Sequence, residues 1–261
     1  MRLTTIIGIG LAISAGCLVS AAQQRGALVA TLPNDVKMEF VRIQPGQFMM
    51  GCSPGDDQCA EHERPAHTVR ITRGFEIGKY EVTSEQWQVV MVTSPFVVYR
   101  NEDKRAAGFI GWSSIQEFFD KLNARKDGYT YRLPTEAEWE YSARAGATSR
   151  YTGPDLPALG WIGQNVYATP QVVGQKKPNA WELSDVHGNV WEWTQDFYDR
   201  NYYSRSPASD PKGPDSGQYR VLRGGSALSD ASSARLSARH FVGAPVTQDY
   251  YGFRVVREPV R

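Results

Sequence analysis

The densest group of potential metal ligands lies in one short segment, Leu183-Ser184-Asp185-Val186-His187-Gly188-Asn189-Val190-Trp191-Glu192-Trp193. Asp185 and Glu192 provide hard carboxylate oxygens, and Gly188 permits a sharp turn that can direct backbone carbonyls inward. Calcium takes six to eight oxygens from such mixed sources, although this pattern is not that of an EF-hand. The alternative is an aspartate-initiated turn followed by a tryptophan-rich strand. The residues alone leave both interpretations open.

A second polar group follows a predicted strand and reads Arg220-Val221-Leu222-Arg223-Gly224-Gly225-Ser226, with Arg235 and Arg239 farther along. Paired glycines let the backbone approach another backbone or a ligand closely. The spacing is not that of a phosphate-binding GxxxxGK[ST] loop. The arginines are therefore interpreted in two ways, as bidentate ligands of an anionic substrate or as braces for loop carbonyls.

The chain has three cysteines, Cys17, Cys52 and Cys59. Removal of a signal peptide would take Cys17 away and leave a pair seven residues apart in a polar loop. This spacing matches no CxxC redox or zinc motif. In an oxidising compartment a disulfide is the natural state of such a pair, so we expect Cys52 and Cys59 to be bonded. A reactive pair or a metal site is the alternative.

Other common chemistries are not supported by the sequence. The four histidines (His62, His67, His187 and His240) show no helical metal-binding spacing, and there is no GxSxG elbow to present a serine nucleophile. The formal net charge is +1, from 29 basic and 28 acidic residues. Because a nucleic-acid binder shows a basic excess, we expect no nucleic-acid partner.

The first 22 residues have the pattern of a secretory signal peptide. Arg2 is followed by an apolar run from Ile6 to Val19 and by Ser20-Ala21-Ala22, a small-residue cleavage site. The run is short for a membrane span, so we expect cleavage, no remaining span, and a periplasmic or secreted protein. Cys17 weakly resembles a lipoprotein site, and its lipidation stays open.

The remaining chain is predicted to hold a linker at 23–36 and one domain at 37–258. Alternating or β-branched stretches predict strands at 38–43, 67–71 and 75–82. Capping boxes predict helices that begin at Thr83, Ser114 and Thr135. After Gly146, short apolar pieces alternate with glycine, proline, asparagine and aspartate. The fold class is therefore α+β, rich in loops and low in regular secondary structure.

An ordered set of motifs resembles the formylglycine-generating enzyme (sulfatase-modifying factor) domain. The motifs are Phe48-Met49-Met50-Gly51, Glu63-x-Pro65-x-His67, Lys79-Tyr80-Glu81-Val82-Thr83, the run from Tyr131 to Glu140, Gly188 to Trp193, Arg223-Gly224-Gly225-Ser226 and Gly252-Phe253-Arg254. Each motif is weak alone, but the set in this order is specific and spans about residues 37 to 257. The resemblance implies a C-type-lectin-like α+β fold.

The resemblance also implies what is missing. Formylglycine-generating members oxidise a peptide cysteine with oxygen and copper, and two cysteines bind the copper shortly after the Gly-Gly-Ser motif. Ser229 stands here at the position of the first cysteine, and the second falls within 231–233, where no cysteine occurs. Cuprous copper selects soft thiolates, so copper is not expected.

Site residues can be carried over by position. Trp191 and Ser226 match residues of the family's substrate groove, and with Ser229, Arg235 and Arg239 they form the predicted substrate-binding set. Asp185, Gly188, Val190 and Glu192 match one calcium site, and Asn165 matches one ligand of a second. A structural calcium ion is therefore expected.

The sequence leaves catalysis uncertain, because the family consists of oxidases but the cysteine pair is absent. We expect an exported family member with an oxidoreductase-like or maturation-accessory role. The alternative is a non-catalytic lectin-like module that binds a peptide, protein, glycan or small molecule in a groove near Ser226.

Overall fold

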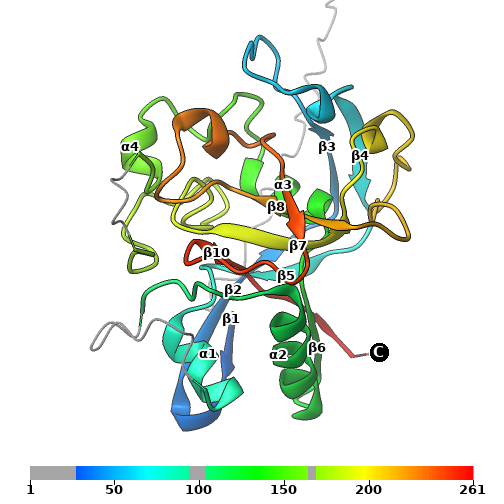
Figure 1. The fold of residues 1–261 in the computed structure, drawn as a ribbon. Coiled ribbons are helices and arrows are strands. Elements are labelled where there is room, and N and C mark those ends of the chain that lie inside the picture. The colour runs from blue at the N-terminus through cyan, green and yellow to red at the C-terminus, as the bar shows by residue number, and fades with distance from the viewer. Residues whose placement is uncertain (1–27, 94–103, 164–168, 261) are drawn as a thin grey trace, which may run out of the picture.

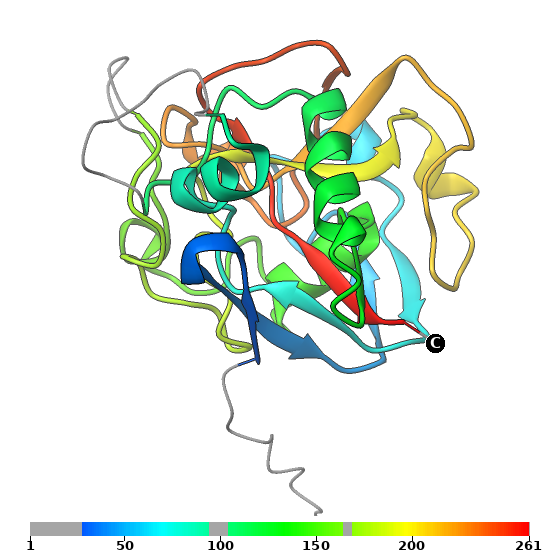
Figure 2. The ribbon, with the colours of Figure 1, turned by 90° about the horizontal axis from the view of Figure 1, so that it is seen from below.

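The computed structural model describes residues 28–93, 104–163 and 169–260. Its strands form three sheets, and strands adjacent in a sheet are often distant in sequence. The five-stranded sheet has the order β1 (Leu28–Thr31), β2 (Lys37–Ile43), β5 (Phe75–Gly78), β11 (Val256–Pro259), β6 (Tyr129–Arg132). The last strand of the chain thus lies between β5 and β6 (Figure 2).

The other two sheets carry the candidate site and the disulfide loop. The four-stranded sheet has the order β10 (Tyr251–Gly252), β7 (Trp191–Phe197), β8 (Tyr219–Arg223), β9 (His240–Gly243). The two-stranded sheet pairs β3 (Gly46–Met50) with β4 (His67–Ile71). The α+β class and the abundance of loops agree with the sequence analysis.

Strand β1 lies inside the expected linker. Leu28 to Thr31 pairs with Phe40 to Lys37 of β2 in antiparallel register, and Ala30 is buried against the core. The folded domain therefore extends N-terminally of residue 37. The pairing could not be found from sequence because four residues carry too little periodicity to predict a strand.

Two of the three predicted helix starts are confirmed by their caps. Thr83 accepts from the Gln86 N–H at the start of α1 (Ser84–Met91), and Thr135 accepts from the Glu138 N–H at the start of α3 (Glu136–Arg144). The predicted start at Ser114 is wrong. The cap position is Gly111, three residues earlier, so helix α2 (Trp112–Ala124) begins at Trp112 and has no side-chain cap.

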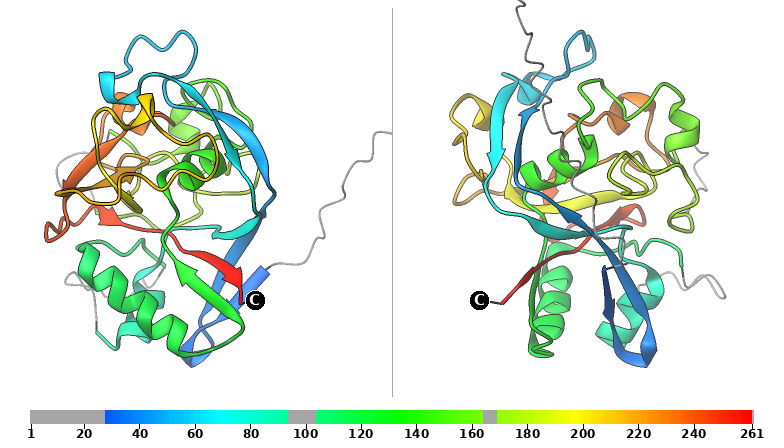
Figure 3. Two further views of the ribbon diagram at one scale, coloured as in Figure 1. Left: turned by 90° about the vertical axis from the view of Figure 1, so that its right-hand side faces the viewer. Right: turned by 180° about the vertical axis from the view of Figure 1, so that it is seen from behind.

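The described helices differ in their packing. Helix α2 buries the predicted face of Ile115, Phe118, Phe119 and Leu122, and Phe118 stacks on Trp87 of α1. Helix α3 lies within a second apolar cluster around Trp139, and α4 (Leu156–Leu159) is a single turn. Figure 1 and Figure 3 show α1 and α2 at one end of the molecule and the loop after β3 at the opposite end.

Candidate functional site

The Arg223-Gly224-Gly225-Ser226 motif ends β8 in a tight turn. Gly224 and Gly225 have φ values of 94° and 80°, which L residues with a Cβ rarely adopt. An added Cβ on Gly225 would lie 3.1 Å from the Cα of Ala234. The two glycines therefore let the following residues fold back against the segment that leads to Arg235.

The turn after these glycines joins the two serines predicted to line the groove. The Ser226 N–H donates to Ser229 Oγ at 2.9 Å, the Ser229 N–H donates to the Ser226 carbonyl at 3.0 Å, and the two hydroxyls lie 3.1 Å apart. Ser226 is buried and Ser229 is half-buried. The oxygen of Ser229 thus serves as a local hydrogen-bond acceptor at the position that the sequence analysis matched to the family's first cysteine.

Trp191 lies beside this turn at the start of β7. The Ala227 N–H donates to the Asn189 carbonyl at 2.9 Å, which joins the two segments. The Trp191 ring lies 5.0 Å from the ring of His240, whose Nε2 is 2.9 Å from the Tyr251 hydroxyl. Burial lowers the pKa of His240, so the ring is neutral near pH 7. The segments that carry Trp191 and Ser226 are thus adjacent, and the substrate-binding role of the two residues stays a prediction.

His240 and Tyr251 were not identified as site residues from the sequence. They stand on β9 and β10, which are at opposite edges of the four-stranded sheet. No local spacing links two such strands. The pairing of Tyr251 with Trp191 and the 5.0 Å between the rings of Trp191 and His240 show that both residues lie near Trp191.

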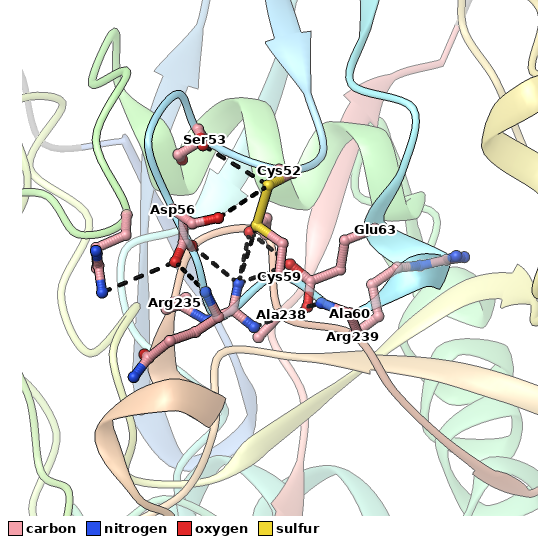
Figure 4. Close-up of polar contacts among 12 residues, drawn as sticks. Cys52, Ser53, Asp56, Cys59, Ala60, Glu63, Arg235, Ala238 and Arg239 are labelled. Carbon is pink, nitrogen blue, oxygen red and sulfur yellow. Dashed lines mark hydrogen bonds and ion pairs between the residues drawn. A yellow bond between two sulfur atoms is a disulfide. The ribbon is translucent and has the colours of Figure 1, made fainter.

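Arg235 is held by carboxylates of the protein itself. Its guanidinium donates to Asp56 Oδ2 at 3.0 Å and to both Glu63 oxygens at 2.7 Å, and Nη1 lies 3.6 Å from Cys59 Sγ. Figure 4 shows this guanidinium among Asp56, Cys59 and Glu63. Arg235 and both acids are buried. Its donors are thus directed to the disulfide loop and the Ser232 carbonyl.

Arg239 has the same kind of environment. It donates to Glu136 through Nε at 2.7 Å and Nη2 at 2.9 Å, and to the His62 carbonyl through Nη1 at 2.7 Å. Burial alone would raise the pKa of Glu136, but Arg239 and Arg223 outweigh it and the pKa is lowered. A substrate-binding role for either Arg235 or Arg239 would have to coexist with these buried ion pairs.

The expected disulfide between Cys52 and Cys59 is confirmed, with a Cα–Cα distance of 5.7 Å. It closes the loop that follows β3. Cys52 is buried and Cys59 is half-buried. The Cys52 N–H donates to the Glu63 carbonyl at 3.0 Å, so the backbone beyond the disulfide is also tied to its start.

We predict that replacing both cysteines by serine lowers the free energy of unfolding by about 2–3 kcal/mol, because the open loop regains conformational entropy in the unfolded chain. Urea unfolding of the oxidised protein and of the double variant measures this difference. A matched control is the Ser204→Ala variant, whose side chain is exposed. Equal midpoints for the double variant and the parent would contradict the prediction.

The predicted calcium segment adopts the sharp turn expected for it. Asp185, Gly188 and Asn189 have φ values of 58°, 91° and 58°. An added Cβ on Gly188 would lie 1.9 Å from the Trp161 carbonyl oxygen, so only glycine fits there. Asp185 is buried, and its Oδ2 accepts from the Gly174 N–H at 2.6 Å. Its Oδ1 has no hydrogen-bond partner among the described residues.

Glu192 differs from Asp185 in its partners. Arg254 donates to both of its oxygens at 2.6 Å, and Trp139 Nε1 donates to Oε2 at 2.8 Å. This carboxylate is therefore bound by three donors. A cation at this place would depend on Asp185 and on backbone carbonyls such as those of Gly188 and Val190.

The electrostatics of this segment fit a cation. Burial raises the pKa of Asp185 to about 6. The pKa of Glu81, which the sequence analysis did not select, is raised well above its usual value by burial, Asp185 and Glu192. Three buried carboxylates thus face one buried guanidinium, Arg254. In the parts of the chain that the structure describes, however, no three His, Cys, Asp or Glu side chains converge on one point as metal ligands.

Two expectations fall on residues that the structure does not describe. Asn165, the predicted ligand of a second calcium ion, is one of them, and the signal peptide with Cys17 is the other. Across the described ranges, no helix combines the length and apolar character needed to cross a bilayer.

Comparisons with known proteins agree with this geometry. The family model described as "Sulfatase-modifying factor enzyme 1-like domain" matches residues 26–259. The formylglycine-generating enzyme of Streptomyces coelicolor is 30% identical over 279 residues, covering 84% of this chain and 88% of that protein.

Two solved structures have the same fold. Treponema denticola variable protein 1 has a TM-score of 0.78 at 27% identity and covers 88% of this chain and 98% of its own. PvdO from Pseudomonas aeruginosa has a TM-score of 0.76 at 25% identity and covers 84% and 94%. These matches confirm the C-type-lectin-like architecture, and the chain belongs to the sulfatase-modifying factor (formylglycine-generating enzyme) family.

Proposed function

We propose that this chain is an exported family member that assists maturation by binding a peptide or protein client, without copper–thiolate oxidation. The Ser226–Ser229 turn carries the proposal. Ser229 occupies the position of the first copper-binding cysteine, and its oxygen already accepts the Ser226 N–H at 2.9 Å. A hydroxyl is a hard neutral donor, whereas Cu(I) selects soft thiolates. The N-terminal pattern and the Cys52–Cys59 disulfide support export.

Client binding is supported by the aromatic side chains beside this turn. Trp191, His240 and Tyr251 form one cluster, in which Trp191 and Tyr251 are buried and His240 is half-buried and available to a client. Aromatic residues are enriched where proteins bind partners, because they bury much apolar surface with few rotatable bonds. In this proposal the surface near Ser226 keeps a recognition role, while the position matched to the oxidising centre holds an oxygen ligand.

A lectin-like module that binds a glycan is the second candidate function. The same observation favours it, since the turn offers hydroxyls in place of thiols. The two candidates differ in the ligand, so binding of peptides and of oligosaccharides to the purified protein distinguishes them.

The oxidative reaction is tested directly on the full chain. With Cu(I), oxygen and a cysteine peptide from a sulfatase, we expect no conversion of the thiol to an aldehyde, measured as a change in peptide mass. The formylglycine-generating enzyme of Streptomyces coelicolor serves as the positive control. Aldehyde formation that disappears in the Ser229→Ala variant would contradict the proposal.

The binding surface is tested by blocking it. Peptides from a fluorescent library are selected on the parent protein, and the Ser229→Tyr variant is expected to bind them at least about tenfold more weakly, a loss of 1.4 kcal/mol or more. Ser204→Tyr, at an exposed position on the 3-10 turn Tyr202–Ser204, is the matched control and should bind normally. Equal affinity of the two variants would place the client elsewhere.

A further inference from the structure

The loop closed by the disulfide and the turn that follows it supply the two acids that hold Arg235. Asp56 lies between the two cysteines, and Glu63 lies in a turn that begins directly after Cys59. The Ala60 N–H donates to Glu63 Oε1 at 3.2 Å, and the Cys52 N–H donates to the Glu63 carbonyl at 3.0 Å. The position of Asp56 therefore depends on the closed form of this loop, and the Glu63 turn is joined to the start of the loop by the Cys52 N–H.

Arg235 connects this loop to the segment that carries Ser229. Its Nε donates to the Ser232 carbonyl at 2.8 Å. Asp230 caps the short turn from Ala231 to Ala234 by accepting from the Ser233 N–H at 2.9 Å. Segment 229–235 thus has Ser229 at one end and an arginine held by the disulfide loop at the other.

The disulfide borders an open pocket through Cys52, and Cys59 is half-buried. An open pocket of about 900 Å³ lies over the loop, and Cys52 forms part of its wall. The other lining residues include Met49, Pro54 and Arg64, which are exposed. On the far side of the disulfide, Cys59 Sγ lies 3.6 Å from Arg235 Nη1, which can donate to this sulfur when it becomes a thiolate.

We propose that Cys52–Cys59 is a redox-active disulfide and that its reduction by a dithiol loosens segment 229–235 through Arg235. One thiolate of the dithiol attacks Cys52 Sγ, which forms a mixed disulfide and releases the Cys59 thiolate. The second thiol of the dithiol then displaces Cys52. The dithiol becomes a cyclic disulfide, and its two protons and two electrons remain on the cysteines as two thiols.

Opening the loop weakens the hold on Arg235 for a physical reason. Asp56 loses the covalent closure of the loop that carries it, and this loop gains conformational freedom relative to the Glu63 turn. Each hydrogen bond from Arg235 to these acids then requires a larger loss of conformational entropy. The regulatory meaning of this change rests on the proposed function, because segment 229–235 borders the proposed client groove.

Hydrogen–deuterium exchange of the full chain tests the proposal without any client. After treatment with dithiothreitol under native conditions, thiol labelling should show both cysteines free. Amides of 229–235 should then exchange about tenfold faster, since exchange reports local opening. Amides of α2, at the opposite end of the molecule, should keep their rates. The Cys52→Ala, Cys59→Ala double variant should show the fast rate with no reductant.

Three results would overturn the inference: a disulfide that dithiothreitol reduces only in denaturant, unchanged exchange at 229–235 after reduction, or equal acceleration in α2. An Asp56→Asn variant tests the coupling through Arg235 separately, because it keeps the disulfide and removes the charge of one partner of Arg235. Its amides at 229–235 should exchange faster than those of the parent before reduction. An exchange rate equal to that of the parent would contradict coupling through Arg235. Failure of client binding would contradict only the proposed function, since exchange is measured on the protein alone.

Discussion

Replacement of Arg239 by methionine is expected to lower the free energy of unfolding by about 3–5 kcal/mol, the range found when one member of a buried ion pair is removed. Glu136 would remain buried after losing the partner that donates to both its oxygens. An anion-binding role for Arg239 predicts instead a stable protein with weaker ligand binding. Urea unfolding of the Arg239→Met variant therefore decides between the two interpretations left open by the sequence.

Two further variants make this result specific. Glu136→Gln in the Arg239→Met background should recover part of the loss, because the buried group is then neutral. Arg200→Met is the matched control, since Arg200 pairs with Glu61 at the exposed surface and such pairs contribute about 0–1 kcal/mol. Arg239→Met with the stability of the Arg200→Met variant would show that the buried pair is not structural.

Features set by neighbouring residues were predictable from the sequence. The caps at Thr83 and Thr135 use donors three residues away, and the buried face of α2 follows from helical periodicity alone. The disulfide joins cysteines seven residues apart. Each of these needs only the local chain, so residue types and spacing were sufficient.

Features that join distant segments were not predictable. Arg239 and Glu136 are 103 residues apart, and Arg235 and Glu63 are 172 apart. The sequence showed arginines after a Gly-Gly-Ser motif but not their partners, so both ligand binding and bracing stayed open. Glu81 was missed for the same reason, because it lies more than a hundred residues before Asp185 and Glu192.

Residues of the ordered motifs contact each other across long distances in sequence. Trp139 of the helix motif donates to Glu192 of the tryptophan-rich motif, and Glu192 also binds Arg254 of the last motif. Residues from three motifs thus meet at one carboxylate. This explains how motifs that are weak alone can specify one fold as a set: their polar side chains satisfy each other in the interior, where an unpaired charge is costly.

The Asp185→Asn substitution is expected to change the stability of the protein in opposite directions with and without calcium. In chelator, burial raises the pKa of Asp185 from 3.8 to about 6. The folded state therefore favours the protonated form, and stability is lost as pH rises from about 4 to 6. Asparagine carries no charge and still accepts from the Gly174 N–H, so the variant should be more stable at pH 7.5 by up to about 3 kcal/mol.

In millimolar calcium the parent should be more stable than the Asp185→Asn variant, because the bound ion stabilises its folded state. A ligand at 100 times its dissociation constant stabilises the folded state by about 2.7 kcal/mol, and the variant lacks the charge that attracts the ion. Asp35→Asn is the matched control, because Asp35 also has positive φ but is exposed; its effect should stay within about 0.5 kcal/mol in either solution. At pH 4, in chelator, Asp185→Asn and the parent should melt together.

The sign of the stability change in calcium distinguishes a bound ion from a buried carboxylate that has no cation. Burial and neighbouring carboxylates disfavour the charge on Asp185 whether or not calcium is supplied, so they predict stabilisation by asparagine in both solutions. Only a bound cation makes that charge favourable and reverses the order of the melting temperatures. If Asp185→Asn is the more stable protein in calcium as well as in chelator, no ion is held at Asp185, and the turn around Gly188 is structural.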